Sequence, residues 1–154
     1  MTTIIEPVLK AHKRCQVTSF YIQAVSIGRT AFLTTNLASE DSTNDIYVTS
    51  AASSWLIGRS SGCAVALGDR SASRRHAVIG HHPHDGFFIA DVGSRNGTWV
   101  NRKRLSVRQR RILNDGDLLQ LGNIRIEFFV VNRSLSDLNS DHVPVYLATS
   151  PIGE

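Results

Sequence analysis

The stretch Gly68–Gly80, GDRSASRRHAVIG, joins a polar and basic segment to the first residues of an apolar one. The apolar half, Ala77–Gly80, is typical of the start of a buried β-strand. The polar half, Asp69–His76, holds three arginines, two serines and a histidine within eight residues. Because arginine and serine side chains are hydrogen-bond donors, the stretch predicts a donor-rich loop at the end of a strand.

Short apolar runs bounded by turn residues continue on both sides of this stretch. The further predicted strands are Asp45–Thr49, Trp55–Ile57, Ala64–Leu67, Phe87–Asp91, Thr98–Val100, Leu118–Leu121 and Ile124–Val131. Turn signals lie between them at Asp85-Gly86 and at Asn114–Asp117. Strands at this spacing, with no convincing helix between them, predict an all-β sandwich or barrel.

The two ends of the chain differ in pattern from this β-rich middle. Val17, Tyr21, Ala24 and Gly28 follow helical spacing, so we expect a helix in the N-terminal segment, although 17–22 is also rich in β-forming residues. A polar linker is expected at 37–45 and a loose tail at 132–154. The predicted division is therefore an extension at 1–44, a β domain at 45–131 and a C-terminal tail at 132–154.

The positive charge is concentrated in the middle of the chain. The net charge is +4, but residues 59–111 hold eleven of the 17 Lys and Arg residues and only three of the 13 Asp and Glu residues. Such a segment favours an anionic partner, which can be a nucleic acid, a membrane surface or a phosphoprotein.

Cysteine usage and hydropathy restrict the class of protein further. Cys15 and Cys63 are too few for a disulfide framework, and neither has a neighbouring cysteine at metal-ligand spacing, so we expect two reduced thiols. We find neither an apolar run of bilayer-spanning length nor the pattern of a signal peptide. A cytoplasmic protein without membrane insertion is expected.

Four motifs together identify a family. They are Gly58-Arg59-Ser60, Ser73-Arg74-Arg75-His76, the run Asp91–Asn101 (DVGSRNGTWVN), and Asp115-Gly116-Asp117 with Leu121-Gly122. In this order and at these separations they resemble the forkhead-associated (FHA) domain, a phosphothreonine-peptide binding module, over about 45–131. The resemblance implies a sandwich of two twisted β-sheets that holds its ligand in loops at one end.

The resemblance also assigns the phosphate-binding residues. Arg59 is expected to donate to the phosphate as a fork, which suits an arginine better than a lysine. Ser73 would add a hydroxyl, and Arg74 a second charged donor. Asn96 would clamp the peptide backbone beside the phosphothreonine, because an amide both donates and accepts. Arg95 is expected to contact the ligand residues that follow the phosphothreonine.

Thr98 and four further residues complete the implied site. Thr98 sits where the family shapes a pocket for the threonine γ-methyl, which rejects phosphoserine. Structural support is expected from Gly58, His76, Gly97 and Asn101, with Gly97 at positive φ. Many family members have glycine after the asparagine of the last turn. Here it is Arg102, so either the turn differs or Arg102 adopts a left-handed conformation.

The histidines invite two other interpretations. Ser73 and His76 resemble a nucleophile and its base, but no Gly-x-Ser-x-Gly elbow and no evident third residue accompany them. We therefore expect His76 to brace the loop and the chain to have no catalytic activity. His81, His82 and His84 are expected on a solvated hairpin loop, and we predict no metal and no cofactor.

The sequence thus predicts a phosphothreonine-dependent interaction module that acts as a signalling adaptor downstream of a Ser/Thr kinase. One alternative is a phosphate-independent scaffold with the same fold, which the presence of both Arg59 and Asn96 disfavours. Another is a nucleic-acid binder that uses the cluster Arg102–Arg111, although Trp99 is its only aromatic neighbour. An oligomer or complex contact is expected through residues 1–44.

Overall fold

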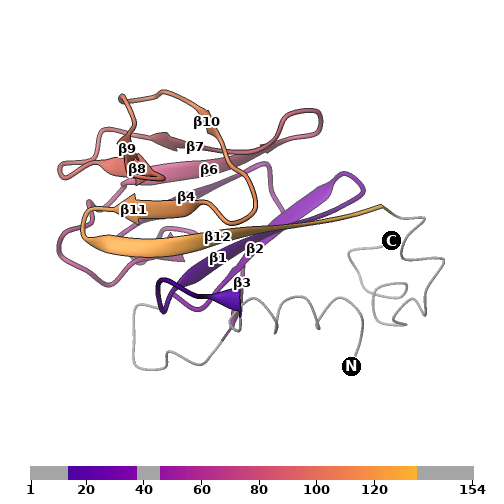
Figure 1. The fold of residues 1–154 in the computed structure, drawn as a ribbon, viewed down its shortest axis with the longest axis horizontal. Helices are drawn as coiled ribbons and strands as arrows, with labels where there is room; N and C mark the ends of the chain where they lie inside the picture. Colours follow the sequence, from indigo (N-terminus) through magenta and orange to yellow (C-terminus); the bar gives the residue numbers. More distant parts are fainter. Residues whose placement is uncertain (1–13, 38–45, 135–154) are drawn as a thin grey trace.

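The computed structural model describes residues 14–37 and 46–134, which fold into two β-sheets (Figure 1). Their strands are β1 (Tyr21–Ile27), β2 (Thr30–Thr35), β3 (Tyr47–Val48), β4 (Ser54–Gly58), β5 (Val65–Ala66), β6 (Ala77–His82), β7 (Gly86–Asp91), β8 (Thr98–Val100), β9 (Lys103–Arg104), β10 (Arg111–Ile112), β11 (Leu118–Leu121) and β12 (Ile124–Arg133). The seven-stranded sheet has the order β3-β2-β1-β12-β11-β8-β9, and the five-stranded sheet the order β10-β7-β6-β4-β5. The predicted all-β sandwich is confirmed.

The strands predicted from the apolar runs are all present. β12 continues two residues beyond its predicted end, and the two-residue strands β9 and β10 were not predicted. Residues 38–45 of the predicted linker and residues 135–154 of the predicted tail lie outside the described residues. No helix among the described residues is long and apolar enough to cross a membrane.

The predicted N-terminal helix is wrong for residues 21–35, which form β1 and β2. β1 pairs antiparallel with β2 and parallel with β12, with Tyr21 opposite Glu127 and Ile27 opposite Arg133. The first six residues of β1 are all buried. Its sequence is therefore a nearly continuous apolar run, without the alternation of apolar and polar residues that marks a half-exposed strand. The helical spacing was a coincidence within that run. The predicted boundary at residue 45 therefore separates two strands from the sheet to which they belong.

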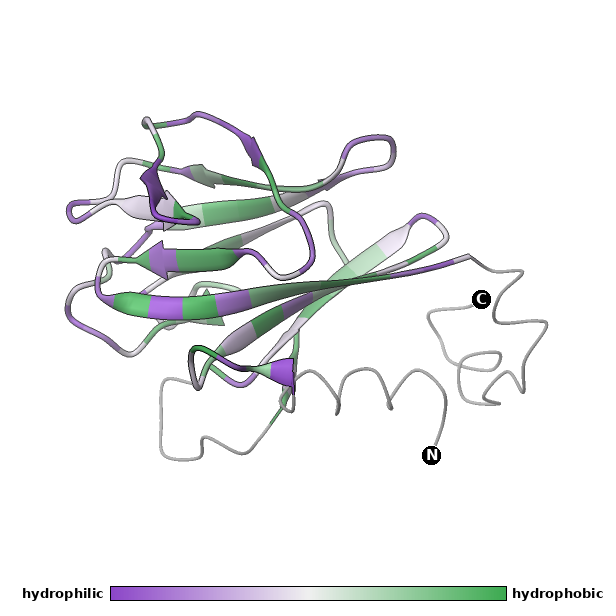
Figure 2. Ribbon diagram, viewed as in Figure 1, coloured by the Kyte–Doolittle hydropathy of each residue, from purple (hydrophilic) through white to green (hydrophobic). Residues whose placement is uncertain are grey.

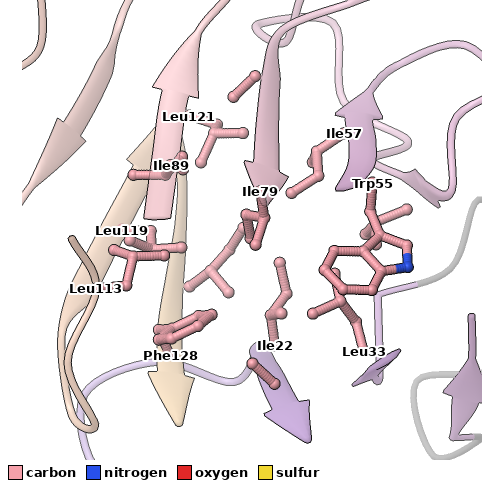
Figure 3. Close-up of a cluster of buried hydrophobic side chains, with 14 of the residues drawn as sticks. Ile22, Leu33, Trp55, Ile57, Ile79, Ile89, Leu113, Leu119, Leu121 and Phe128 are labelled. Atoms are coloured by element: carbon pink, nitrogen blue, oxygen red, sulfur yellow. The ribbon is translucent and has the colours of Figure 1, made fainter. Parts of the chain in front are cut away.

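The core lies between the two sheets. Figure 2 shows apolar residues along the strands and polar residues in the loops around them. The side chains of Ile22, Leu33, Ile79 and Phe128 meet between the sheets (Figure 3), and each is fully buried. Burying one such side chain stabilises the fold by about 1.5–3 kcal/mol. This rigid core holds the connecting loops in place.

The loops that carry the predicted site residues meet at one end of the sandwich. These are the loop after β4, the loop before β6 and the loop between β7 and β8, and the β11–β12 turn contacts the last two. Gly122 N donates to Gly97 O over 3.1 Å, and Asn123 N donates to Ser71 Oγ over 2.8 Å. The β1–β2 and β6–β7 turns lie at the opposite end (Figure 1).

Candidate functional site

The loop before β6 is the centre of the site, because both neighbouring loops hydrogen-bond to it. Arg59 N donates to Ser73 O over 2.8 Å, and Arg95 N donates to Ser73 Oγ over 2.9 Å. Asn96 Nδ2 donates to Ser71 O over 2.8 Å. The structure therefore brings Arg59, Ser73, Arg95 and Asn96 together from three separate loops.

Gly58 allows the end of β4 to approach this loop closely. A Cβ atom at position 58 would lie 2.2 Å from the carbonyl oxygen of Arg74, which is far too short for a contact. Ser60 N donates to the same oxygen over 3.2 Å. Any side chain at position 58 would push the two loops apart, and Arg59 would move with them.

The guanidinium of Arg59 is oriented by a hydrogen bond, and its charge is not neutralised by a carboxylate of the described residues. Its Nε donates to Ala72 O over 3.0 Å, while the side chain remains exposed. Its two terminal nitrogens have no hydrogen bond to any described residue, and no described carboxylate pairs with it. An arginine held in this way presents a fixed pair of donors, which is the geometry that a phosphate accepts in a bidentate manner.

His76 braces the loop from the interior. It is fully buried; its Nδ1 accepts from Ser73 N at 3.0 Å, and its Nε2 lies 2.8 Å from Gly97 O. The ring is therefore the neutral tautomer with the proton on Nε2. Desolvation lowers the pKa of His76, although the Gly97 carbonyl and Asp91 oppose the shift. Because both nitrogens are engaged, the ring has no free nitrogen with which to deprotonate the Ser73 hydroxyl.

Asp91, to which the sequence interpretation gave no role, organises the loop between β7 and β8. Its buried carboxylate accepts from Gly93 N at 2.7 Å, from Ser94 N at 2.8 Å and from the Ser94 hydroxyl. Burial raises the pKa of Asp91, but these hydrogen bonds and one from Thr98 outweigh it and leave the pKa below its usual value. An Asp at a strand end, with Gly and Ser two and three residues later, is a turn signal from which this role of Asp91 could have been predicted.

Thr98 is not at the surface with the other predicted residues. It is fully buried, and its hydroxyl donates to Asp91 Oδ2 over 2.7 Å. The expected γ-methyl pocket at Thr98 is therefore not supported, because a side chain with no exposed area cannot line a surface pocket. Its hydroxyl instead helps to hold the turn that presents Asn96.

Asn96 and Gly97 form the tip of that turn. Asn96 is exposed, and its Oδ1 accepts no hydrogen bond from the described residues, so it remains free for a peptide N–H. Gly97 has φ 93°, and a Cβ there would lie 2.8 Å from Arg104 Nε. Ser71, another residue not singled out from the sequence, donates from its hydroxyl to Asp69 Oδ1 over 2.6 Å and ties the loop to Asn123.

The turn at Asn101-Arg102 decides between the two alternatives for Arg102. Both residues have positive φ, 50° and 71°, and they connect the paired residues Val100 and Lys103. Two consecutive left-handed residues in a two-residue hairpin are typical of a type I′ turn. Asn101 has the expected structural role, since its side chain donates to Asp117 Oδ1 and accepts from Leu118 N, each over 2.9 Å.

The cations of the site have no carboxylate partners among residues 14–37 and 46–134. The ion pairs among the described residues are Arg14 with Asp115 and His82 with Asp85, both outside the site loops. Arg74, Arg75 and Arg95 are exposed, like Arg59. In the part of the chain that the structure describes, no group of three or more His, Cys, Asp or Glu side chains is placed to hold a metal ion. The site is thus a positively charged, donor-rich surface suited to an anion.

Comparison with known proteins agrees with this geometry. Residues 55–122 match the family model of the FHA domain. The chain is 44% identical over 63 residues to an oxoglutarate dehydrogenase inhibitor of Corynebacterium diphtheriae, covering 40% of this chain and 41% of that protein. It is 38% identical over 71 residues to the glycogen accumulation regulator GarA of Mycobacterium tuberculosis, covering 46% of this chain and 41% of that protein. The chain thus spans less than half the length of these relatives.

Two solved structures are also similar to this chain. An FHA domain studied for its phosphothreonine-dependent interactions is 29% identical, with a TM-score of 0.48, over 70% of this chain and 92% of its own. The FhaA FHA domain, solved with the intracellular domain of another protein, is 32% identical, with a TM-score of 0.46, over 56% of this chain and 89% of its own.

The matched segment contains the loop after β4, the loop before β6 and the loop between β7 and β8, and it identifies an FHA domain within the chain. Residues 55–122 thus form an interaction module of the FHA class.

Proposed function

We propose that the chain binds a phosphothreonine-containing protein through Arg59, Ser73 and Asn96 and acts as an adaptor downstream of a Ser/Thr kinase. The observation that carries the proposal is the Arg59 guanidinium, which is held by Ala72 O while its two terminal nitrogens have no partner in the described part of the chain. A phosphothreonine supplies about −1.5 to −2 charges and three acceptor oxygens for such a fork.

Each remaining residue has a definable part in this proposal. The Ser73 oxygen accepts from Arg95 N, so its own proton is available for a phosphate oxygen. Asn96 offers its free Oδ1 to the peptide backbone, while its Nδ2 is fixed on Ser71 O. Arg74 and Arg95 add positive charge at the rim. The names of the relatives, an enzyme inhibitor and a metabolic regulator, support a regulatory role for this chain.

The test is binding of a peptide pool with one fixed phosphothreonine and random flanking residues. We expect retention of this pool, no retention of the same pool with threonine, and at least about ten-fold weaker binding by Ser73→Ala, because hydrogen bonds to charged groups contribute about 1.5–3 kcal/mol. Ser53→Ala, at an exposed serine next to β4 (Ser54–Gly58), is the matched control. Equal retention of the two pools would contradict the proposal. A phosphoserine pool tests the expected preference for threonine separately.

A further inference from the structure

A basic strip extends away from the phosphate site along one continuous segment. It consists of Arg102, Lys103, Arg104, Arg108, Arg110 and Arg111, and no Asp or Glu lies anywhere between residues 92 and 114. Five of these side chains are exposed and Arg111 is half-buried. None forms an ion pair with a described residue.

Two arginines of the strip are held in place by aromatic rings. The guanidinium carbon of Arg104 lies 5.2 Å from the centre of the Trp99 ring, and that of Arg110 lies 4.6 Å from the centre of the Phe88 ring. Such stacking fixes a cation while leaving its N–H groups at the surface. The strip therefore presents positioned charges that the described residues do not neutralise.

The strip is physically continuous with the phosphate site. Arg104 lies against the turn that presents Asn96, since a Cβ at Gly97 would meet its guanidinium. Leu105 N donates to Thr98 O over 2.9 Å, and Arg108 N donates to Asp91 O over 2.8 Å. A ligand seated on Asn96 would reach the strip without leaving the surface of the domain.

The charges exceed what one phosphate requires. A phosphothreonine brings about −2 charges, which the four cations Arg59, Arg74, Arg75 and Arg95 already more than balance. We propose that the basic strip binds acidic side chains that flank the phosphothreonine in the same ligand. This inference rests on the proposed function. It implies that the kinase that creates the ligand phosphorylates threonines within acidic sequences.

A nucleic acid fits the strip less well. Proteins that bind single strands provide aromatic faces on which bases stack. Here the Trp99 and Phe88 rings are already covered by Arg104 and Arg110. An extended acidic peptide needs only the charges and donors.

The experiment compares three phosphothreonine peptides with the full chain: one with uncharged flanks, one with three glutamates before the phosphothreonine and one with three after it. We expect one of the acidic peptides to bind at least about five-fold more tightly than the uncharged one at low salt, because an exposed ion pair contributes about 0.2–1 kcal/mol. The gain should shrink at high salt. In K103Q/R108Q we expect the gain to fall below about two-fold, with the affinity for the uncharged peptide unchanged.

The matched control is R29Q/R133Q, which removes two charges at the far end of the sandwich and should keep the gain. Equal affinity of the wild-type chain for all three phosphopeptides overturns the proposed role of the strip but does not contradict the proposed function. A gain that both double variants lose equally also overturns it, because net charge alone would then explain it. If none of the phosphopeptides binds, both proposals fail. A short DNA or RNA could instead bind the wild-type chain and lose that binding in K103Q/R108Q. If the glutamate-flanked peptides then show no gain in affinity, the strip is assigned to nucleic acid.

Discussion

His76 and Asp91 show how single buried polar residues fix the conformation of the site loops. Neither side chain is exposed, yet each satisfies backbone groups of a loop that carries candidate binding residues: His76 bonds Ser73 N and Gly97 O, and Asp91 bonds Gly93 N and Ser94 N. A buried group whose partner is removed costs about 1–3 kcal/mol. His76 and Asp91 therefore hold the site loops from the interior of the sandwich. Each must keep one protonation state to do so, neutral for His76 and charged for Asp91.

His76 should make the stability of the domain depend on pH. Its pKa in the folded state lies below the unfolded value of about 6.5, so its contribution is complete above that pH and is lost as the pH falls below it. In urea unfolding at pH 7.5, 6.5 and 5.5, the wild-type free energy of unfolding should decrease towards acid. His76→Gln should be less stable at pH 7.5 and show a flatter dependence. The lowered carboxyl pKa values of Asp91 and Glu127 act at lower pH. Identical slopes for the two proteins would contradict the assigned role.

Residue types in the motifs predicted which side chains meet, but not all of their partners. Arg59, Ser73, Arg95 and Asn96 do meet, because the motifs mark loops at strand ends. Thr98 is buried, and nothing local in the sequence indicates that its hydroxyl bonds Asp91 below the surface. The contribution of each predicted residue to ligand binding stays a prediction.

At the scale of elements, local pairing was predictable and distant pairing was not. The Asp85-Gly86 turn predicts the β6–β7 hairpin from neighbouring residues alone. The parallel pairing of β1 with β12 joins residues about a hundred positions apart, and no turn signal in the sequence predicts this pairing. A segment buried on both faces also lacks the alternation that distinguishes a strand from a helix. For this reason residues 21–35 were assigned to the wrong element.

Glu127 of β12 ties the segment before β1 to the sheet. Its carboxylate accepts from Gln16 N at 3.0 Å, and from Val17 N and Thr18 N at 2.8 Å each. Glu127→Gln removes the charge from these bonds, and charge-assisted bonds are roughly twice as strong as neutral ones. We expect hydrogen exchange of these amides to become roughly ten-fold faster or more.

Arg125→Gln is the control for that substitution, because Arg125 is an exposed residue of the same strand. It should leave exchange at residues 16–18 unchanged. If exchange in Glu127→Gln is as slow as in the wild-type chain, the carboxylate does not hold this segment.

At the scale of the whole molecule, the site loops lie at one end of the sandwich and are supported by both sheets. β1 lies between β2 and β12, near the middle of the seven-stranded sheet. The site loops depend on this sheet, because the β11–β12 turn contacts both Ser71 and Gly97. We therefore expect that the folding unit and the candidate binding surface cannot be separated at residue 45.

Truncation tests this dependence. A chain that begins at Ile46 lacks β1 and β2, so it leaves one edge of β12 unpaired and Ile22 and Leu33 missing from the core. We expect it to lose cooperative urea unfolding. A chain that begins at Arg14 keeps every described strand and should unfold cooperatively. Cooperative unfolding of the shorter chain would show that residues 21–35 are dispensable.

Recognition of a phosphate by the Arg59 fork is the central claim, and titration calorimetry of one peptide pair tests it most directly. We predict that the wild-type chain binds the phosphothreonine peptide and not its threonine twin. Arg59→Lys should lose at least about thirty-fold in affinity, because a lysine is a point charge without the fork and losing a charge-assisted pair costs about 2–5 kcal/mol. Arg29→Lys, at an exposed arginine in the β1–β2 turn, should bind like the wild-type chain. Undiminished binding by Arg59→Lys, or equal binding of both peptides by the wild-type chain, would contradict the account.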